Sequence, residues 1–235
     1  MQSMPSEFRY RAVLFDLDGT LLDTVPDLAL SANRMLAELH RPGQTEALIS
    51  TFVGRGINKL VERVLAGSID GTVPSAQLQH GLEIFERCYA EESGRRSRPY
   101  PGVVEGLDQL VAAGMPMAVV TNKAARFTLE LLERVGIGHY FKAVVSGDTL
   151  PVRKPDPQPV QYACKQLEVA PADALFIGDS RHDVEAGRGA GCAVWCVPYG
   201  YNEGVSTDTL NCDRMVPDIA VAARWILGPS ERSGG

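Results

Sequence analysis

Five short runs of apolar residues stand out along the chain, and each is continuous rather than alternating. They are Ala12–Phe15, Met117–Val120, Ala143–Val145, Ala174–Ile177 and Ala193–Val197. A strand that is apolar at every position is covered on both faces, as the strands of parallel sheets are. We therefore expect five strands of one buried parallel sheet.

Between the later runs, apolar residues recur at helical spacing. These stretches are Val103–Ala113, Ala124–Val135, Asp156–Leu167 and Val184–Ala190. Gly114, Gly136 and Gly191 each follow such a stretch, and a glycine just past the last periodic residue is typical of a helix C-terminus. The alternation predicts an α/β fold, with a Rossmann-like parallel sheet and helices on both faces.

The segment from Pro26 to Arg98 interrupts this alternation, because it has no strand-like run. It carries three apolar stripes at helical spacing instead: Leu28, Met35, Leu36 and Leu39; Ile57, Leu60, Val61, Val64 and Leu65; Leu78, Leu82, Phe85 and Tyr89. We expect residues 26–98 to form an inserted all-α helical bundle. The α/β core would then comprise residues 10–25 and 99–228, with flexible polar termini at 1–9 and 229–235.

Composition narrows the range of functions. The 235 residues suffice for a sizeable core with an insert, and the net charge of −6 speaks against a nucleic-acid partner, which requires a basic surface. No apolar run approaches the roughly 20 residues of a membrane helix. Five scattered cysteines form no disulfide framework and no metal-binding pair, which favours a reducing compartment. We expect a cytoplasmic protein without a membrane partner.

Polar residues that could carry chemistry follow four of the predicted strands or the loops after them. They are Asp16 and Asp18, Thr121 to Lys123, Lys154, and Asp179, Ser180 and Asp183. In open parallel sheets, ligands bind at the carboxyl ends of the strands. Carboxylates at the end of a buried strand are costly unless they are paired or bind a metal. This pattern predicts a Mg²⁺-dependent phosphoryl-transfer site.

Four segments, in this order and spacing, resemble the motifs of the haloacid dehalogenase-like phosphatase superfamily. They are Asp16–Thr20, Val120–Lys123, Lys154-Pro155 and Gly178–Asp183, and the helical insert resembles the type-1 cap of that superfamily. The resemblance implies that Asp16 attacks phosphorus and forms an aspartyl-phosphate. It also implies that the Asp18 side chain protonates the leaving group and later takes a proton from water.

The other motif residues receive supporting roles. One oxygen of Asp16, the main-chain carbonyl of Asp18 and a carboxylate oxygen of Asp179 would bind Mg²⁺. Thr121, Asn122 and Lys154 would hold the phosphate, Asn122 through its backbone N–H, and the backbone N–H groups near Asp18 and Lys123 could add to them. Ser180 and Asp183 would lie behind these groups, with Asp183 orienting Lys154 or a metal-bound water. Asp183 could equally be a helix N-terminal carboxylate.

Three further segments resemble bacterial phosphoglycolate phosphatases: Phe52–Gly56, Ser146–Pro157 and Val197–Gly204. This resemblance implies hydrolysis of 2-phosphoglycolate, a small anionic ester. Arg55 could bind its carboxylate, or could be a solvated arginine in a turn between two helices. The Tyr199–Gly204 loop either lines the site or is a tight turn, and His182 is expected to face solvent.

Several alternatives stay open at this stage. Another small phosphate ester, such as a sugar phosphate, could be the substrate, and a phosphosugar mutase can share the first motif. Asp18 argues against a dehalogenase and a phosphonate hydrolase; the latter also needs a Schiff-base lysine, for which the insert offers only Lys59. A regulatory or binding protein on the same fold is the non-enzymatic alternative. The protein could be a monomer or a homodimer.

Overall fold

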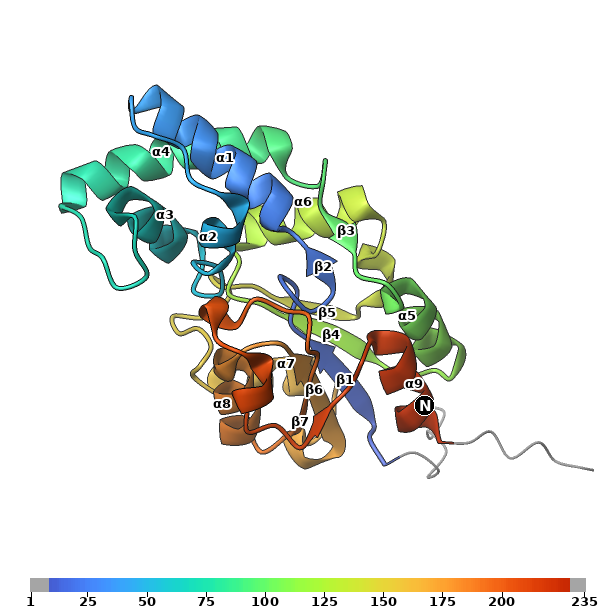
Figure 1. The fold of residues 1–235 in the computed structure, drawn as a ribbon. Helices are drawn as coiled ribbons and strands as arrows, with labels where there is room; N and C mark the ends of the chain where they lie inside the picture. Colours follow the sequence, from blue (N-terminus) through green and yellow to red (C-terminus); the bar gives the residue numbers. More distant parts are fainter. Residues whose placement is uncertain (1–8, 229–235) are drawn as a thin grey trace, which may run out of the picture.

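The computed structural model describes residues 9–228, and its centre is a six-stranded parallel sheet (Figure 1). The strands are β1 (Ala12–Phe15), β4 (Met117–Val120), β5 (Ala143–Val145), β6 (Ala174–Gly178), β7 (Ala193–Cys196) and β8 (Arg214–Met215). They lie in the order β5-β4-β1-β6-β7-β8, and all neighbouring pairs are parallel. The five predicted strands are confirmed. The sixth, β8, was missed because two residues at a sheet edge leave no readable pattern.

Helices cover both faces of this sheet. They are α5 (Val103–Ala112), α6 (Ala125–Val135), α7 (Gln158–Gln166), α8 (Arg181–Ala190) and α9 (Ile219–Leu227). Val13 and Phe15 of β1 belong to one hydrophobic cluster, with residues of α5 and α9, whereas Leu14 belongs to another, with residues of α7. Successive strand residues point to opposite faces, so the central strand contributes to both cores. The predicted α/β class is confirmed.

The inserted helices are α1 (Val25–Glu38), α2 (Glu46–Ser50), α3 (Ile57–Ala66) and α4 (Ser75–Glu92). Their buried apolar residues form a separate hydrophobic cluster, which Phe127 of α6 joins. Figure 1 shows these helices beyond the end of the sheet where β1 leads into β2 (Leu22–Asp23). They therefore lie over the edge at which the candidate residues are expected.

The chain segments that enter and leave the insert are paired with each other. β2 runs antiparallel to β3 (Arg98–Pro99), so the expectation of no strand up to Arg98 is wrong by this short element. The buried carboxylate of Asp27 also accepts hydrogen bonds from the backbone N–H groups of Gly94, Arg96 and Ser97. The first turn of α1 is thereby tied to the returning chain.

Within residues 9–228, no helix is both long and apolar enough to cross a membrane. The termini predicted to be flexible, 1–9 and 229–235, lie outside the described residues apart from Arg9, which is exposed. Four single-turn 3₁₀ helices complete the described chain: Gly138–Tyr140, Pro171–Asp173, Asn202–Gly204 and Thr207–Thr209.

Candidate active site

The carboxyl ends of three central strands bring Asp16, Thr121 and Asp179 to one edge of the sheet. Asp16 extends the pairing of β1 with β6, because its N–H donates to the Ile177 carbonyl at 2.9 Å. Thr121 likewise extends β4, donating its N–H to the Val145 carbonyl at 2.9 Å. Beyond Asp16 the chain turns at Gly19, whose φ of 94° favours glycine. These side chains are held by the sheet itself rather than by mobile loops.

Lys154 connects two carboxylates beneath this edge. Its Nζ donates to Asp16 Oδ1 at 2.5 Å, to Asp183 Oδ1 at 2.7 Å and to the Val120 carbonyl at 2.7 Å. Burial alone would lower the pKa of Lys154, but the charges of Asp16 and Asp183 outweigh it and raise that pKa. An ammonium has three protons, and all three are used here.

Asp183 serves both Lys154 and the helix on which it lies. Its Oδ2 accepts hydrogen bonds from the Ser180 hydroxyl at 2.6 Å and from the backbone N–H of Ser180 at 3.0 Å. Ser180 and Asp183 thus form a capping box at the N-terminus of α8. Burial would raise the pKa of Asp183, but Lys154 and Ser180 lower it overall. Asp183 thus contacts Lys154 and also lies in the first turn of α8, and its functional role stays a prediction.

A cluster of carboxylates could hold a metal ion. Oxygens of Asp16, Asp179 and Asp183 lie within 4.8 Å of one another. Burial is the main reason why the pKa of Asp16 is raised and that of Asp179 is raised to about 7, and the charge of Asp183 adds to both effects. Three buried carboxylates share the single ammonium of Lys154, which leaves excess negative charge. A divalent cation with oxygen ligands suits this set.

The loop after β7 orients Asp179. The N–H of Tyr201 donates to Asp179 Oδ2 at 2.8 Å, and the Thr20 hydroxyl donates to Oδ1 at 2.9 Å. A Cβ on Gly200 would lie only 2.1 Å from the Cβ of Asp179, so glycine permits the close approach. Tyr201 also donates its hydroxyl to Asp23. The Tyr199–Gly204 loop therefore both packs tightly and borders the site.

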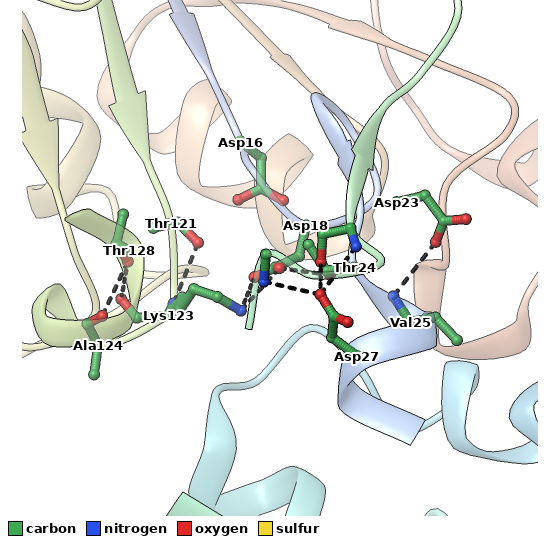
Figure 2. A network of polar contacts seen from close by, with 12 residues as sticks. Asp16, Asp18, Asp23, Thr24, Val25, Asp27, Thr121, Lys123, Ala124 and Thr128 are labelled. Atoms are coloured by element: carbon green, nitrogen blue, oxygen red, sulfur yellow. Dashed lines mark hydrogen bonds and ion pairs between the residues drawn. The ribbon is translucent and has the colours of Figure 1, made fainter. Parts of the chain in front are cut away.

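Asp18 has a cationic partner that sequence analysis missed. Lys123 Nζ lies 2.9 and 3.1 Å from the two oxygens of Asp18, and the Thr24 hydroxyl donates to Oδ1 at 2.6 Å. Figure 2 shows the Lys123 side chain reaching from the end of β4 toward Asp18. Sequence analysis considered only the backbone of Lys123, although its place directly after Thr121-Asn122 was the available signal.

A pocket of about 40 Å³, partly open to solvent, lies above Asp16 and Asp18. Its floor comes from the core, and its roof comes from the inserted helices. The lining comprises Asp16, Asp18, Thr121, Asn122 and Lys123 below, with Leu28, Val53, Gly54, Gly56, Ile57 and Leu60 above. Lys154, Asp179, Ser180 and Asp183 border an adjoining cavity with the same two aspartates.

The structure places two further candidate residues of this region. Arg55 is exposed and lies outside the pocket lining, although its neighbours Gly54 and Gly56 belong to it, so the structure does not bring the Arg55 side chain to the site. Asn122 uses both amide N–H groups on the carbonyls of Gly54 and Lys154, which leaves only its backbone N–H for a phosphate.

His182 does not face solvent. It is 4% exposed in the first turn of α8, and its Nε2 lies 3.3 Å from Glu203 Oε2. Glu203 also forms an ion pair of 2.6 Å with Arg63 of α3. The prediction was wrong because α8 begins three residues before its apolar pattern, which turns His182 inward. The resulting cluster of Arg63, Glu203 and His182 joins the insert to the core.

Two aspartates follow the first strand, and a buried lysine and further carboxylates lie behind them. This arrangement is typical of a haloacid dehalogenase-like site. Residues 13–197 match the family described as haloacid dehalogenase-like hydrolase, and the chain belongs to this family. The sequence and structure comparisons agree with that assignment.

The chain is similar to several relatives over nearly its whole length. It is 48% identical to a phosphoglycolate phosphatase of Thiobacillus denitrificans, over 96% of this chain and 99% of the relative. It is 49% identical to one of Nitrosospira multiformis, over 92% and 95% of the two chains. The crystal structure of a predicted phosphoglycolate phosphatase from Haemophilus somnus 129PT superposes with a TM-score of 0.84, at 35% identity and with 90% and 96% covered.

Proposed function

We propose that this protein hydrolyses 2-phosphoglycolate to glycolate and phosphate. The observation that carries the proposal is the 41–49% identity, over most of the chain, to relatives named phosphoglycolate phosphatase. The small pocket supports it, because the leaving group of this ester has only a two-carbon skeleton. The acidic cluster and Lys154 support phosphoryl transfer at the same place.

Asp16 is the proposed nucleophile. Lys154 holds its Oδ1, whereas its Oδ2 accepts no hydrogen bond from the described residues and Asp16 borders the pocket. Oδ2 attacks phosphorus, the bond from phosphorus to the ester oxygen breaks, and the phosphoryl group is carried on Asp16. The charge of Lys154 fixes the direction of the carboxylate and favours its ionised form.

Asp18 is the proposed acid and base. Its carboxyl group lies on the pocket floor, where it protonates the departing ester oxygen and then takes a proton from the water that cleaves the aspartyl-phosphate. The Thr121 hydroxyl accepts a hydrogen bond from the Lys123 N–H at 3.2 Å, so its own proton is free to donate to a phosphate oxygen. The backbone N–H of Asn122 would add a second donor.

Mg²⁺ fits the acidic cluster, with Asp16, Asp179 and the main-chain carbonyl of Asp18 as the proposed ligands. When bound, it supplies positive charge that offsets the repulsion between the Asp16 carboxylate and the phosphate dianion. Asp183 would orient Lys154 rather than bind the ion, since Lys154 holds its Oδ1 and its Oδ2 already accepts three hydrogen bonds, whereas each oxygen of Asp179 accepts only one. Residues 26–98 would act as a cap that excludes water from the closed site.

The experiment that tests this function is phosphate release across a panel of small esters with Mg²⁺ present. The panel contains 2-phosphoglycolate, sugar phosphates and p-nitrophenyl phosphate. We expect the highest kcat/KM for 2-phosphoglycolate. A higher kcat/KM for a sugar phosphate would show that 2-phosphoglycolate is not the preferred substrate. A folded protein that hydrolyses none of the esters would overturn the enzymatic function.

A further inference from the structure

The roof of the pocket offers little that could bind a second negative charge. Leu28, Val53, Ile57 and Leu60 are apolar, and no arginine side chain lies in the lining. 2-Phosphoglycolate, however, has a carboxylate besides its phosphate. An ionised carboxylate in an apolar space is costly without a cation or hydrogen-bond donors. A carboxylate in this pocket therefore needs a positively charged side chain or hydrogen-bond donors from the protein.

Lys123 is the one cationic side chain in the pocket lining. Lys154, below, already uses its three protons on Asp16, Asp183 and the Val120 carbonyl. Lys123 donates to the two oxygens of Asp18, and the buried Tyr89 hydroxyl lies near the same ammonium. Its side chain is 3% exposed and its Nζ lies 5.1 Å from the centre of the Tyr89 ring. Two protons of this ammonium face Asp18, and the third can be donated to a ligand or to the Tyr89 hydroxyl, which has no other hydrogen-bond partner among the described residues.

The position of Lys123 matches the geometry of the substrate. Only one methylene separates the carboxylate of 2-phosphoglycolate from the ester oxygen that Asp18 is proposed to protonate. A cation that touches Asp18 is consequently within reach of that carboxylate. A sugar phosphate or an alkyl phosphate has no anionic group at this distance from its ester oxygen.

The N-terminus of α3 lies across the same pocket. Gly56 precedes the helix with a φ of 79°, and no side chain caps the first turn. Gly56 and Ile57 both line the pocket, so the uncapped N–H groups of this ten-residue helix begin at its wall. Such groups favour an anion, and here they would add to a cation already in place.

We propose that Lys123 is the specificity-determining residue that binds the substrate's carboxylate, assisted by the first N–H groups of α3. This role rests on the proposed function and replaces the one expected for the Arg55 side chain. Lys123 then links recognition to chemistry, because the same ammonium contacts Asp18.

The test compares two esters that differ only at the relevant group. 2-Hydroxyethyl phosphate has the skeleton of 2-phosphoglycolate with the carboxylate replaced by a hydroxymethyl group. We expect Lys123→Met to lower kcat/KM for 2-phosphoglycolate on the order of 10- to 100-fold more than for 2-hydroxyethyl phosphate, mostly through KM. Lys123→Arg should retain part of the wild-type preference.

Two matched variants serve as controls. Lys59 lies on α3, pairs with Glu62 and is outside the pocket lining, so Lys59→Met should leave the preference unchanged. Arg55→Met should also leave it unchanged; loss of the preference in this variant, with Lys123→Met retaining it, would overturn the proposal. If Lys123→Met does not fold, Lys123→Gln and inhibition of wild type and variant by glycolate provide the same comparison.

The outcomes separate this inference from the function on which it rests. Equal losses toward both esters in Lys123→Met would mean that Lys123 only positions Asp18, and the carboxylate role would be refuted. If the wild-type protein itself hydrolyses both esters equally well, the proposed substrate is wrong, whatever the variants do.

Discussion

At the scale of single residues, two buried lysines provide the positive charge that balances the aspartates of the site. Lys154 and Lys123 are both almost fully buried, and each neutralises a different aspartate of the first motif. Burial raises the pKa of Asp16, and the Lys154 charge opposes that rise. Removing one charge therefore changes the state of its partner as well as its own contacts.

The first prediction concerns Asp16, the proposed nucleophile. Asp16→Asn should lower phosphate release by roughly 10³-fold or more, because an amide oxygen does not displace the ester oxygen. The amide is isosteric, so we expect the circular dichroism spectrum and the cooperativity of unfolding to be preserved. Activity within tenfold of wild type would sink the assignment.

A second prediction concerns Lys154. Lys154→Met leaves Asp16 and Asp183 buried without their shared counter-charge, which should cost about 3 to 5 kcal/mol of unfolding free energy and most of the activity. Urea denaturation followed by fluorescence measures the unfolding free energy, and phosphate release measures the activity. The exposed Lys142→Met is the control and should change neither quantity measurably. An unchanged urea midpoint for Lys154→Met would show that the ion pairs contribute little.

The sequence predicted the position of a site residue correctly where that residue closely follows an apolar run. Asp16 and Asp179 come straight after apolar runs, so their strands fix where they lie. Lys123 comes after the strand has ended, where no periodicity gives the direction of a side chain. His182 was misplaced because the Ser180–Asp183 capping box, which marks the start of α8, was not used. The roles of these residues stay proposals, since geometry brings groups together without naming the reaction.

At the scale of elements, one buried ion pair connects α3 to the turn at Asn202–Gly204. Arg63 contacts Glu203 at 2.6 Å, and the Arg63 and Glu203 side chains are 3% and 7% exposed. Asn202 and Glu203 have φ values of 36° and 52°, which are strained for residues other than glycine. The pairing of Glu203 with Arg63 and His182 stabilises this turn and holds the insert against the core.

The pH dependence of this contact has a definite sign. Burial would raise the pKa of Glu203, but His182 and Arg63 outweigh it and lower that pKa from 4.5 to about 2. A lowered carboxyl pKa stabilises the fold above pH 4.5, and this contribution is lost as the pH falls from 4.5 toward 2. The contact should therefore be fully present at neutral pH.

Glu203→Gln should accordingly lower the unfolding free energy at pH 7 by about 3 kcal/mol, the cost of leaving a buried Arg63 unpaired. The difference from wild type should shrink below pH 4.5. Urea titrations at pH 7, 5 and 3.5 measure this difference, with Glu62→Gln, a partly exposed glutamate of α3 that pairs with Lys59, as control. A difference that is constant across this range would contradict the role of the Glu203 charge.

At the scale of the whole molecule, the acidic cluster brings together two strands of the core that are far apart in sequence. Asp16 follows the first strand and Asp179 follows β6, and the Thr20 hydroxyl and the Tyr201 N–H hold Asp179 in place. An ion bound there contacts segments that are far apart in sequence only when the chain is folded. Metal binding should therefore stabilise the entire core rather than one loop.

The last prediction tests this coupling. Because the folded-state pKa of Asp179 is raised to about 7, ionisation of Asp179 opposes folding, and the metal-free protein should lose stability as the pH rises from about 4 to about 7. Mg²⁺ at 100 times its dissociation constant should restore about 2.7 kcal/mol at pH 8. In Asp179→Asn we expect a smaller loss over this pH range and little response to Mg²⁺. Thermal unfolding with a chelator and with Mg²⁺, from pH 5 to 8, measures both effects. Equal Mg²⁺ responses in the wild type and the variant would place the ion elsewhere.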